Sequence, residues 1–552
     1  MREYSVLIGG KAGEGINTAG LTIASLFDHL GYRIYMYFDY PSLIRGGHNF
    51  AIIRAAEKKV GTHRDTLDVV LALDQNSIDR HADQIRNDTV VLYDTYAVKR
   101  AEGYGIPINQ IVEEEKAPAI TRNSAMMAAF CRAAGIDREL LESVFRRSIK
   151  EKYIDVNLRV AERAYGAIDE VFRIPGLGQT GLPALTGNEA IGLGLVRGGL
   201  DTYIGYPMTP TSNLLHFLAE HTRAFPVRVI HPENEIGVML MALGSAYAGN
   251  KTAVGTSGGG FCLMTEGLSL AGMSEMPITI VEGQRPGPST GMPTYTAQGD
   301  LHFVLNAGQG EFPRLIVSPG DLEEAYTWSA AALMLSWKYQ IPAIVLADKT
   351  LCEGTFSFDI DAAERPPEAS PYLWDGEGEY RRYALTDTGI SPLAFPPAEG
   401  ALIKANSYTH DESGFTTEDA ARAGIMQEKA LRKAAGLARE LEGYRTVSVS
   451  GSPDATTVVA SFGSQKGAVL EAAEHLGLKT ARPLVLNPFP VRQWKEALDG
   501  ADSVICVENN ATGQLARLLR NHGFSVDETV LKYDGRPFSL EELTARLSEA
   551  VA

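Results

Sequence analysis

The segment from Tyr203 to Glu220, YIGYPMTPTSNLLHFLAE, holds a threonine between two prolines where an apolar run turns into a helical pattern. Pro207 and Pro210 restrict the backbone on either side of Thr209, so its hydroxyl is presented in a fixed direction. A group that is already ordered loses little entropy when a ligand binds. Thr209 is therefore a candidate binding residue.

Two other segments place charged side chains after predicted strands. Glu233 and Glu235 open the helical pattern of HPENEIGVMLMALGSAYAG, and Arg285 ends VEGQR. Carboxylates at a helix N-terminus are commonly present for the helix dipole alone. Ligands of open α/β sheets, however, bind outside the carboxyl ends of strands. We therefore expect Thr209, Glu235 and Arg285 to converge on one crevice, where the guanidinium could hold an anionic substrate through two hydrogen bonds.

Three glycine-rich stretches allow both a structural and a functional interpretation. GGKAGEG, Gly9 to Gly15, could hold a phosphate between a strand and a helix, but it lacks the dinucleotide and P-loop spacings, so a tight turn is favoured. In LIRGGHNF, Arg45 is a candidate for an anionic ligand, and His48 is expected to make a local hydrogen bond. TSGGGFCLMTEGLSLAGMSEMP indicates a closely packed helix on composition alone.

Composition limits the class of protein. The 552 residues carry a net charge of −17, which argues against nucleic-acid binding. No stretch has the length and apolarity of a membrane helix, and the N-terminal MREYSVLIGG lacks the pattern of a signal peptide, so we expect a cytoplasmic location. The four cysteines are far apart and form no CxxC pair, so neither a local metal or iron–sulfur site nor a disulfide framework is expected.

The elements that must position these residues alternate between apolar β-branched runs and helical patterns, which is typical of parallel sheets covered by helices. We predict three open α/β sheet domains. The domains are 1–175, which ends near the Gly/Pro-rich stretch 174–187, then 188–355, and 443–552. Between the last two we expect an ordered arm, 356–442, that closes with a charged helix over 421–442.

Four ordered motifs carry a family resemblance: GYPMTPTS, ENEIGVMLMALGSAYAG, TSGGGFCLMTEGLSLAGMSEMPITIVEGQRPGPSTGMPT and VENNATGQLARLLR. In this order they resemble the alpha subunits of 2-oxoacid:ferredoxin oxidoreductases. IGGKAGEGINTAG and YPSLIRGGHNF look like the gamma domain of the same family, fused in front. The resemblance implies that 1–175 is a gamma domain, 188–355 binds the pyrimidine ring of thiamine diphosphate (ThDP), and 443–552 is a transketolase C-terminal-like domain.

Enzymes of this family decarboxylate a 2-oxoacid with ThDP, pass electrons through a [4Fe–4S] cluster to ferredoxin and transfer the acyl group to coenzyme A. The resemblance implies that Glu235 hydrogen-bonds ring nitrogen N1′, which favours the imino form that removes the proton of the reactive thiazolium carbon. Thr209 and Arg285 match the residues that bind the substrate carboxylate. The further positions implied for cofactor binding are Tyr206, Pro207, Thr256 and Gly258.

Two parts of the family's active site are missing from this sequence. The GDG segment that holds the diphosphate and Mg²⁺ does not occur, nor do clustered cysteines for the [4Fe–4S] cluster. In the family both belong to the beta subunit, so the resemblance implies ThDP shared with a beta subunit, in an (alpha-beta)2 heterotetramer. The fused layout and the SYTHDESGFTTEDA arm favour 2-oxoglutarate as substrate, ahead of pyruvate and branched-chain 2-oxoacids.

Three other functions remain possible from the sequence. A non-redox ThDP enzyme of the transketolase type would share the pyrimidine domain and would need no cluster. A nucleotide- or coenzyme-A-binding scaffold without catalysis would depend on the glycine loop alone. An NAD dehydrogenase is disfavoured because the loop lacks the dinucleotide spacing.

Overall fold

The computed structural model describes the whole chain except residues 1, 42–46, 100–101 and 367. Its contacts group into two compact units. The first unit comprises residues 1–185, 354–359 and 538–545, and the second comprises 186–353, 360–537 and 546–552. Each unit therefore includes segments that are distant in sequence, whereas the domain ranges expected from the sequence are continuous. Arg45, a candidate for an anionic ligand, lies outside the described residues.

An eight-stranded sheet forms the first unit, in the order β6-β5-β4-β1-β3-β2-β14-β7 among the described residues. Its strands are β1 (Glu3–Lys11), β2 (Arg33–Asp39), β3 (His48–Ala56), β4 (Leu67–Ala72), β5 (Ile85–Asp94), β6 (Tyr104–Ile106), β7 (Ala184–Thr186) and β14 (Thr355–Ser357).

The expectation of purely parallel sheets is wrong for this first unit. Strand β1 is parallel to β4 but antiparallel to β3, and β2 is antiparallel to both β3 and β14. The connection between β2 and β3, residues 40–47, is too short for the crossover that parallel neighbours need. Helices pack over this sheet with a core of aliphatic and aromatic side chains. They are α1 (Ile16–His29), α2 (Asn76–Asp79), α3 (Ile108–Glu114), α4 (Arg122–Ala133), α5 (Arg138–Ser148) and α6 (Glu151–Tyr165).

The second unit is built on a seven-stranded sheet in the order β18-β12-β13-β11-β10-β8-β9. Here the parallel arrangement is confirmed for every neighbouring pair except β12 and β18. The strands are β8 (Thr202–Gly205), β9 (Arg228–Ile230), β10 (Thr252–Thr256), β11 (Ile278–Gln284), β12 (Leu315–Val317), β13 (Pro342–Asp348) and β18 (Val485–Asn487). The helices are α7 (Gly187–Arg197), α8 (Ser212–Glu220), α9 (Glu235–Tyr247), α10 (Gly258–Met273), α11 (Leu301–Asn306), α12 (Leu322–Tyr339) and α13 (Lys349–Glu353).

A third, five-stranded sheet belongs to the same unit, in the order β15-β17-β16-β19-β20. Its strands are β15 (Val447–Gly451), β16 (Thr457–Ser461), β17 (Lys479–Pro483), β19 (Ser503–Glu508) and β20 (Glu528–Leu531), with helices α15 (Lys466–Leu476), α16 (Val491–Ala497) and α17 (Gln514–Asn521). The first half of α18 (Leu540–Val551) belongs to the first unit. Buried Arg482 pairs with Glu324 of α12, at 2.6 Å, and thereby ties the third sheet to the second. The expected fold class, α/β with three open sheets, is confirmed.

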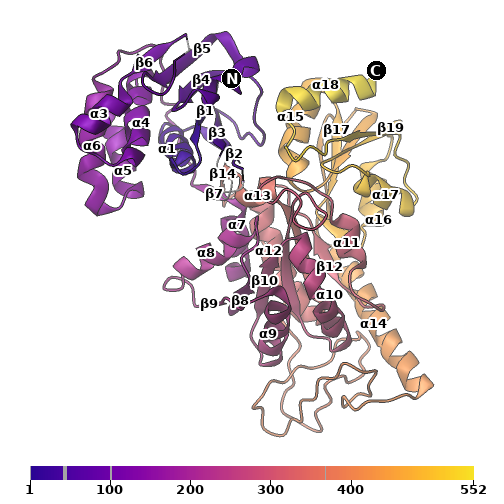
Figure 1. Cartoon of the computed structure of the whole chain (residues 1–552). Helices are drawn as coiled ribbons and strands as arrows, with labels where there is room; N and C mark the ends of the chain where they lie inside the picture. Colours follow the sequence, from indigo (N-terminus) through magenta and orange to yellow (C-terminus); the bar gives the residue numbers. More distant parts are fainter. Residues whose placement is uncertain (1, 42–46, 100–101, 367) are drawn as a thin grey trace. The chain divides into compact units, whose positions relative to one another are not determined.

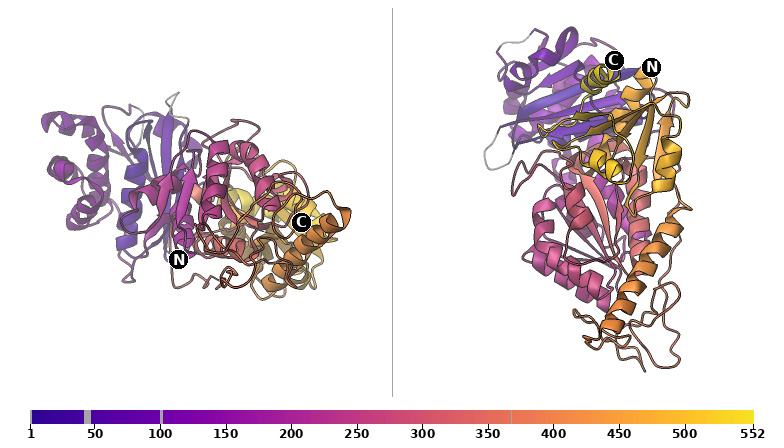
Figure 2. Two further views of the ribbon diagram at one scale, coloured as in Figure 1. Left: turned by 90° about the horizontal axis from the view of Figure 1, so that it is seen from below. Right: turned by 90° about the vertical axis from the view of Figure 1, so that its right-hand side faces the viewer.

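The segment between the second and third sheets has little regular structure until helix α14 (Ala420–Leu441). Figures 1 and 2 show α14, in orange, running alongside the helices of the second sheet. Lys338 of α12 pairs with Glu440 of α14 at 2.6 Å, which attaches α14 to a helix that covers the second sheet. The bounds of this helix lie within one residue of the expected range 421–442.

Candidate functional site

The carboxyl ends of β8, β10 and β11 lie side by side because β10 is the middle strand of the three. Gly205 of β8 is in register with Gly255 of β10, and Thr256 of β10 is in register with Glu282 of β11. Parallel strands end at the same edge of a sheet, so the loops that follow these three strands must share one edge. The expected convergence of the motifs therefore follows from the sheet itself.

The loop after β8 crosses this edge of the sheet. Gly283 of β11 makes room for it, because a β-carbon there would lie 2.7 Å from Pro210 Cγ and 2.8 Å from Thr211 Cγ2. The Thr209–Pro210 peptide bond is cis. Asn188 donates a hydrogen bond to the carbonyl of Pro210, at 2.9 Å. The sequence indicated that the prolines restrict this loop. The structure adds a hydrogen bond and close packing against the sheet.

Arg285 and Thr209, which are distant in sequence, are in direct contact. Arg285 Nη1 donates a hydrogen bond to the backbone oxygen of Thr209, at 2.8 Å. In the described part of the chain this is the single hydrogen bond of a guanidinium that has five N–H donors, so the others remain free for a ligand. Burial lowers the pKa of Arg285, and the nearby carboxyl groups of Asp300 and Glu282 oppose that shift.

Glu235 is the first residue of α9, and only 4% of it is exposed. The side chain of Asn234 caps this helix by accepting a hydrogen bond from the backbone N–H of Gly237, at 2.9 Å. Glu235 is therefore not needed as the cap, and no described residue donates a hydrogen bond to its carboxylate. Glu233, the alternative candidate, is exposed to solvent. Of the two glutamates, Glu235 is the one buried in the protein with its acceptor capacity unused.

Thr256 lies beside Glu235, at the end of β10. A β-carbon at Gly260 would collide with Thr256 Oγ1 and lie 2.8 Å from Glu235 Oε1, so the absence of a side chain there lets the two groups approach. Gly258 begins α10, and a β-carbon there would lie 2.5 Å from Asp300 Oδ2. At both positions a side chain would therefore collide with a neighbouring polar group, so only glycine fits.

Tyr206 and Pro207 are the most open of the expected cofactor-binding residues. Tyr206 is 37% exposed, with its ring centroid 6.1 Å from that of His231, and Pro207 is exposed. Neither contacts the Glu235 carboxylate by any hydrogen bond. The structure thus brings together Thr209 with Arg285 and Glu235 with Thr256, and leaves Tyr206 and Pro207 at the rim.

Two acidic residues of this region were not identified from the sequence. Glu282, in β11, is completely buried, and Asp300 stands just before α11. The available signal was an acidic residue inside the otherwise apolar strand ITIVEGQ, which is unusual because buried charges are costly.

Next to Glu235, helices α9 and α10 expose large apolar side chains. Ile236 is 51% exposed, Leu240 45% and Leu263 49%. Ile236 and Leu240 are four residues apart, so they lie on the same face of α9. An apolar surface beside a buried carboxylate is a typical feature of a contact with another protein.

The glycine loop of the first unit lies between β1 and α1, as expected. Gly15 has φ 78° and precedes the helix as a tight turn requires. The Glu14 carboxylate accepts hydrogen bonds from the backbone N–H of Lys11 at 2.9 Å and from Arg122 at 2.8 Å. His48 is buried, with its Nε2 3.2 Å from Nε2 of His81, and burial lowers its pKa to about 4.

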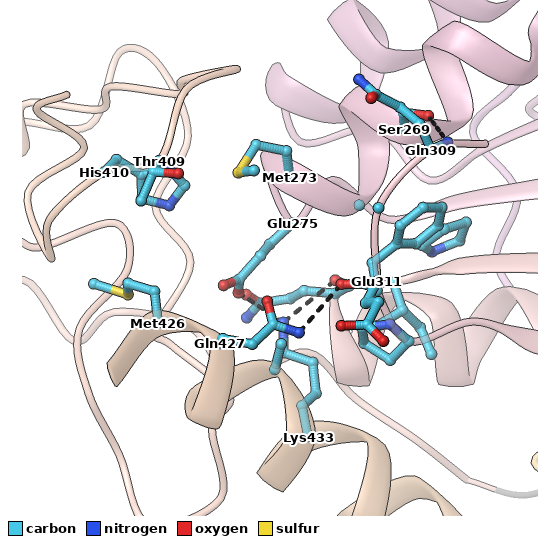
Figure 3. A pocket seen from close by; sticks show the side chains of 18 of the residues that line it. Ser269, Met273, Glu275, Gln309, Glu311, Thr409, His410, Met426, Gln427 and Lys433 are labelled. Carbon is cyan, nitrogen blue, oxygen red and sulfur yellow. Dashed lines mark hydrogen bonds and ion pairs between the residues drawn. The ribbon is translucent and has the colours of Figure 1, made fainter. Parts of the chain in front are cut away.

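A separate cavity of about 280 Å³ lies at the opposite edge of the second sheet, between the end of α10, the arm and α14 (Figure 3). Glu275 lies in its wall, and its carboxylate pairs with Lys429 at 2.6 Å and with Lys433 at 2.6 Å. Arg382 of the arm donates to the carbonyl oxygen of Glu275 at 2.7 Å. This cluster of one carboxylate and three cations is called the arm cluster below.

The described residues contain no group of three or more His, Cys, Asp or Glu side chains arranged to hold a metal ion. In the same part of the chain, no helix has the length and apolar composition needed to cross a membrane.

Comparisons with known proteins identify the family. The family model "Pyruvate flavodoxin/ferredoxin oxidoreductase, thiamine diP-bdg" matches residues 194–430, and "Pyruvate ferredoxin/flavodoxin oxidoreductase" matches residues 5–167. The 2-oxoacid:ferredoxin oxidoreductase 2, subunit alpha, of Aeropyrum pernix is 30% identical, over 97% of this chain and 96% of that protein. The 2-oxoglutarate oxidoreductase subunit KorA of Mycobacterium tuberculosis is 31% identical, over 67% of this chain and 57% of that protein.

A solved structure agrees over the full length. It is a 2-oxoglutarate:ferredoxin oxidoreductase from Magnetococcus marinus with 2-oxoglutarate, coenzyme A and succinyl-CoA bound, and it matches with a TM-score of 0.90, 29% identity and coverage of 100% of both chains. The fold, the edge at which the motifs meet and the similarity along nearly the whole sequence lead to one assignment. The chain belongs to the family of 2-oxoacid:ferredoxin oxidoreductase alpha subunits, and it is a subunit of an enzyme of that class.

Proposed function

We propose that the chain is the alpha subunit, with a fused gamma domain, of an enzyme that oxidatively decarboxylates 2-oxoglutarate to an acyl-CoA and CO₂ and reduces ferredoxin. The family membership gives the reaction class. The names of the M. tuberculosis and M. marinus proteins support 2-oxoglutarate as the substrate, and the coenzyme A bound in the latter supports coenzyme A as the acyl acceptor.

The buried Glu235 carboxylate, with no donor from the described residues, carries the cofactor assignment. Such a group fits the pyrimidine ring of ThDP, because a ring N–H would supply the hydrogen bond that the protein does not. In the surrounding low dielectric, the hydrogen bond to Glu235 is stronger than it would be in water.

When bound, ThDP supplies the nucleophilic carbon that attacks the oxo group of the substrate. Glu235 holds the proton at ring nitrogen N1′. Thr209 and Arg285 bind and orient the substrate carboxylate, which all 2-oxoacids share, through a hydroxyl and a bidentate guanidinium contact. Because Arg285 also donates to the Thr209 carbonyl, it fixes the loop that carries its partner.

The site requires a second subunit, because this sequence contains no GDG segment and no cysteine cluster. A beta subunit would hold the ThDP diphosphate, Mg²⁺ and the [4Fe–4S] cluster, and ferredoxin would take the electrons. The exposed apolar face of α9 and α10, with Ile236, Leu240 and Leu263, supports a partner that covers the cofactor site. The assembly we propose is an (alpha-beta)2 heterotetramer.

The test is reconstitution. The chain purified alone should be colourless and inactive, and it should gain ThDP-dependent reduction of ferredoxin when mixed with the beta subunit. Activity should be measured on 2-oxoglutarate, pyruvate and a branched-chain 2-oxoacid, with kcat/KM expected to be highest for 2-oxoglutarate. Stoichiometric iron and sulfide in the isolated chain, or turnover without the partner, would contradict the proposed division of the site.

A further inference from the structure

Glu282 is a carboxyl group without an ordinary partner. It is completely buried in the middle of the second sheet, and neither of its oxygens accepts a hydrogen bond from any donor that the structure describes. Asp348, a buried acid nearby, is different, because Ser464 donates to it at 2.7 Å and the backbone N–H of Leu351 at 3.1 Å. A buried carboxylate that lacks donors is very costly, so Glu282 requires another explanation.

A second carboxyl group, that of Asp300, lies close enough to Glu282 for a hydrogen bond. Asp300 stands against Gly258, two residues after Thr256, which is in register with Glu282 in the sheet. Two carboxylates accept hydrogen bonds and donate none, so the contact is favourable only if one of the pair carries a proton. The position of Asp300 is well defined. Its backbone N–H donates to Gln284 Oε1 at 3.0 Å, and its carboxylate approaches so close to Gly258 that no β-carbon fits there.

The surroundings determine which of the two acids is charged. Asp300 stands at the N-cap position of α11 but does not cap that helix; it lies instead beside Gly258, at the start of α10. The amino end of a helix favours a negative charge. Asp300 also interacts more strongly with the Arg285 charge than Glu282 does, and Glu282 has no exposure to water. Burial raises the pKa of both groups, and their mutual hydrogen bond raises that of Glu282 and lowers that of Asp300.

We propose that Glu282 is a neutral carboxylic acid at physiological pH, that it donates a hydrogen bond to Asp300, and that this bond positions Asp300 beside Arg285. The three groups then carry no net charge. With Glu282 ionised they would be net negative and would repel an anionic substrate. The positioning of Asp300 beside Arg285 matters for substrate binding only if Arg285 has the proposed role in binding the substrate carboxylate. The protonation of Glu282 does not depend on that role.

The other ionisable groups that act on Glu282 are consistent with a neutral acid. Asp348, at the end of β13, adds further negative charge, and Cys352 of α13 is a buried thiol whose own pKa is raised by burial. The Arg285 guanidinium favours the ionised form, but burial and the two nearby acids outweigh it. Glu282 is therefore a positioning residue that acts through Asp300 on the substrate-binding arginine.

Infrared spectroscopy of the purified full-length chain tests the protonation directly. A protonated carboxyl group has a C=O stretching band that is distinct from the bands of a carboxylate. The difference spectrum between wild type and Glu282→Gln at neutral pH should show the loss of one protonated carboxyl band. Glu311→Gln, at an exposed glutamate, is the control and should remove only carboxylate absorption. Loss of carboxylate absorption alone in Glu282→Gln would overturn the proposal.

The pH dependence of stability is a second test on the chain alone. The folded state keeps a proton on Glu282 that the unfolded state loses above about pH 4.5, so wild-type stability should fall with rising pH compared with Glu282→Gln. One retained proton changes the unfolding equilibrium constant by about tenfold per pH unit. Urea unfolding between about pH 5.5 and about pH 7 measures this slope. Identical slopes in the two proteins would contradict a protonated Glu282.

The positioning role is tested in the complex with the beta subunit. Gln can still donate to Asp300, so Glu282→Gln should keep KM for the 2-oxoacid within about threefold of wild type. Glu282→Met, of similar length without a donor, should raise KM on the order of tenfold with a smaller change in kcat. Equal KM values for the two variants would overturn the positioning role. If no complex turns over any 2-oxoacid, the proposed function fails, while the infrared result remains valid.

Discussion

The two edges of the second sheet use charge in opposite ways. At the carboxyl edge, Glu235 and Glu282 are buried and accept no hydrogen bond from any residue that the structure describes, and Arg285 makes one hydrogen bond within the same part of the chain. At the amino edge, in the arm cluster, Glu275 is paired with two buried lysines. The edge with unused hydrogen-bonding capacity is the one where the family motifs meet.

Helix ends explain why the arm cluster can hold more cations than anions. The last turns of α10 and α12 end next to the cluster, where Arg382 donates to the carbonyl of Ser274 at 3.2 Å and Lys433 lies 3.4 Å from that of Gln340. The carboxyl end of a helix favours positive charge. The cations lower the pKa of Glu275, so the carboxylate stays ionised. The cluster is therefore complete without a ligand, and it fastens the arm and α14 to the sheet.

The largest expected effect concerns Glu235. Glu235→Gln should leave the fold intact and slow the exchange of the ThDP thiazolium proton by about 10²–10⁴-fold, the scale of a lost general acid–base group. Exchange can be followed by NMR in the complex with the beta subunit. Glu233→Gln is the matched control, because this neighbouring glutamate is exposed. A wild-type exchange rate in Glu235→Gln would remove the residue from the cofactor site.

At the amino edge of the second sheet, a change in the arm cluster should lower the stability of the fold. Glu275→Gln leaves Lys429 and Lys433 buried without a counterion, and removal of one partner from a buried pair costs about 3–5 kcal/mol. The free energy of unfolding of the full chain measures this loss. Glu496→Gln removes a glutamate from the surface pair with Arg492 and should cost less than about 1 kcal/mol. Similar losses in the two variants would show that the arm cluster does not hold the arm in place.

The contact between Arg285 and Thr209 predicts a graded, coupled loss of substrate binding. Arg285→Ala should lower kcat/KM by the equivalent of about 2–5 kcal/mol. Thr209→Ala should cost nearer to about 1 kcal/mol. The double variant should lose less than the sum, because the two residues share one ligand group. The measurement requires two 2-oxoacids with different side chains, since a loss confined to one of them would exclude a common carboxylate site.

The smallest expected effect is a dependence of stability on alkaline pH at the arm cluster. Burial lowers the pKa of Lys433 to about 7, whereas the unfolded chain keeps this proton up to its ordinary pKa of 10.5. The unfolded state thus binds more protons above about pH 7, and wild-type stability should rise with pH in this range. Between about pH 7 and about pH 9 the gain over Lys433→Met should be about 2 kcal/mol. A curve of the same shape in Lys433→Met would contradict this titration.

Much of the fold could be predicted from the sequence because its signals are local. Apolar runs gave the strands of the second and third sheets, and the charged helix α14 was expected at 421–442 and lies at Ala420–Leu441. The antiparallel pairs of the first sheet were missed because alternation of strands and helices does not show the direction of a strand. The addition of β14 to β2 depends on contacts between distant segments, which no local pattern predicts.

Some residues of the candidate site could likewise be identified from local sequence motifs, and others could not. Thr209, Glu235 and Arg285 could be identified because motifs at strand ends mark the binding edge of an α/β sheet. The partnership of Glu282 with Asp300 could not, because Asp300 reaches it from a loop whose course depends on the packed structure. The arm cluster was missed for a similar reason, since Glu275 and its lysines are far apart in the chain and meet only when α14 docks.

The composition of the first unit has a consequence for the order in which the protein can fold on the ribosome. Domains generally fold from the N-terminus as the chain is synthesised. Here β2 stays an open sheet edge until β14 has been made, roughly 300 residues later, and unpaired edges are sites of aggregation. Residues 538–545, which complete the unit, are synthesised later still: the Thr62 hydroxyl donates to the Phe538 carbonyl at 2.7 Å, and Arg64 pairs with Glu541 at 2.9 Å. The first unit is thus completed only after most of the second unit has been made.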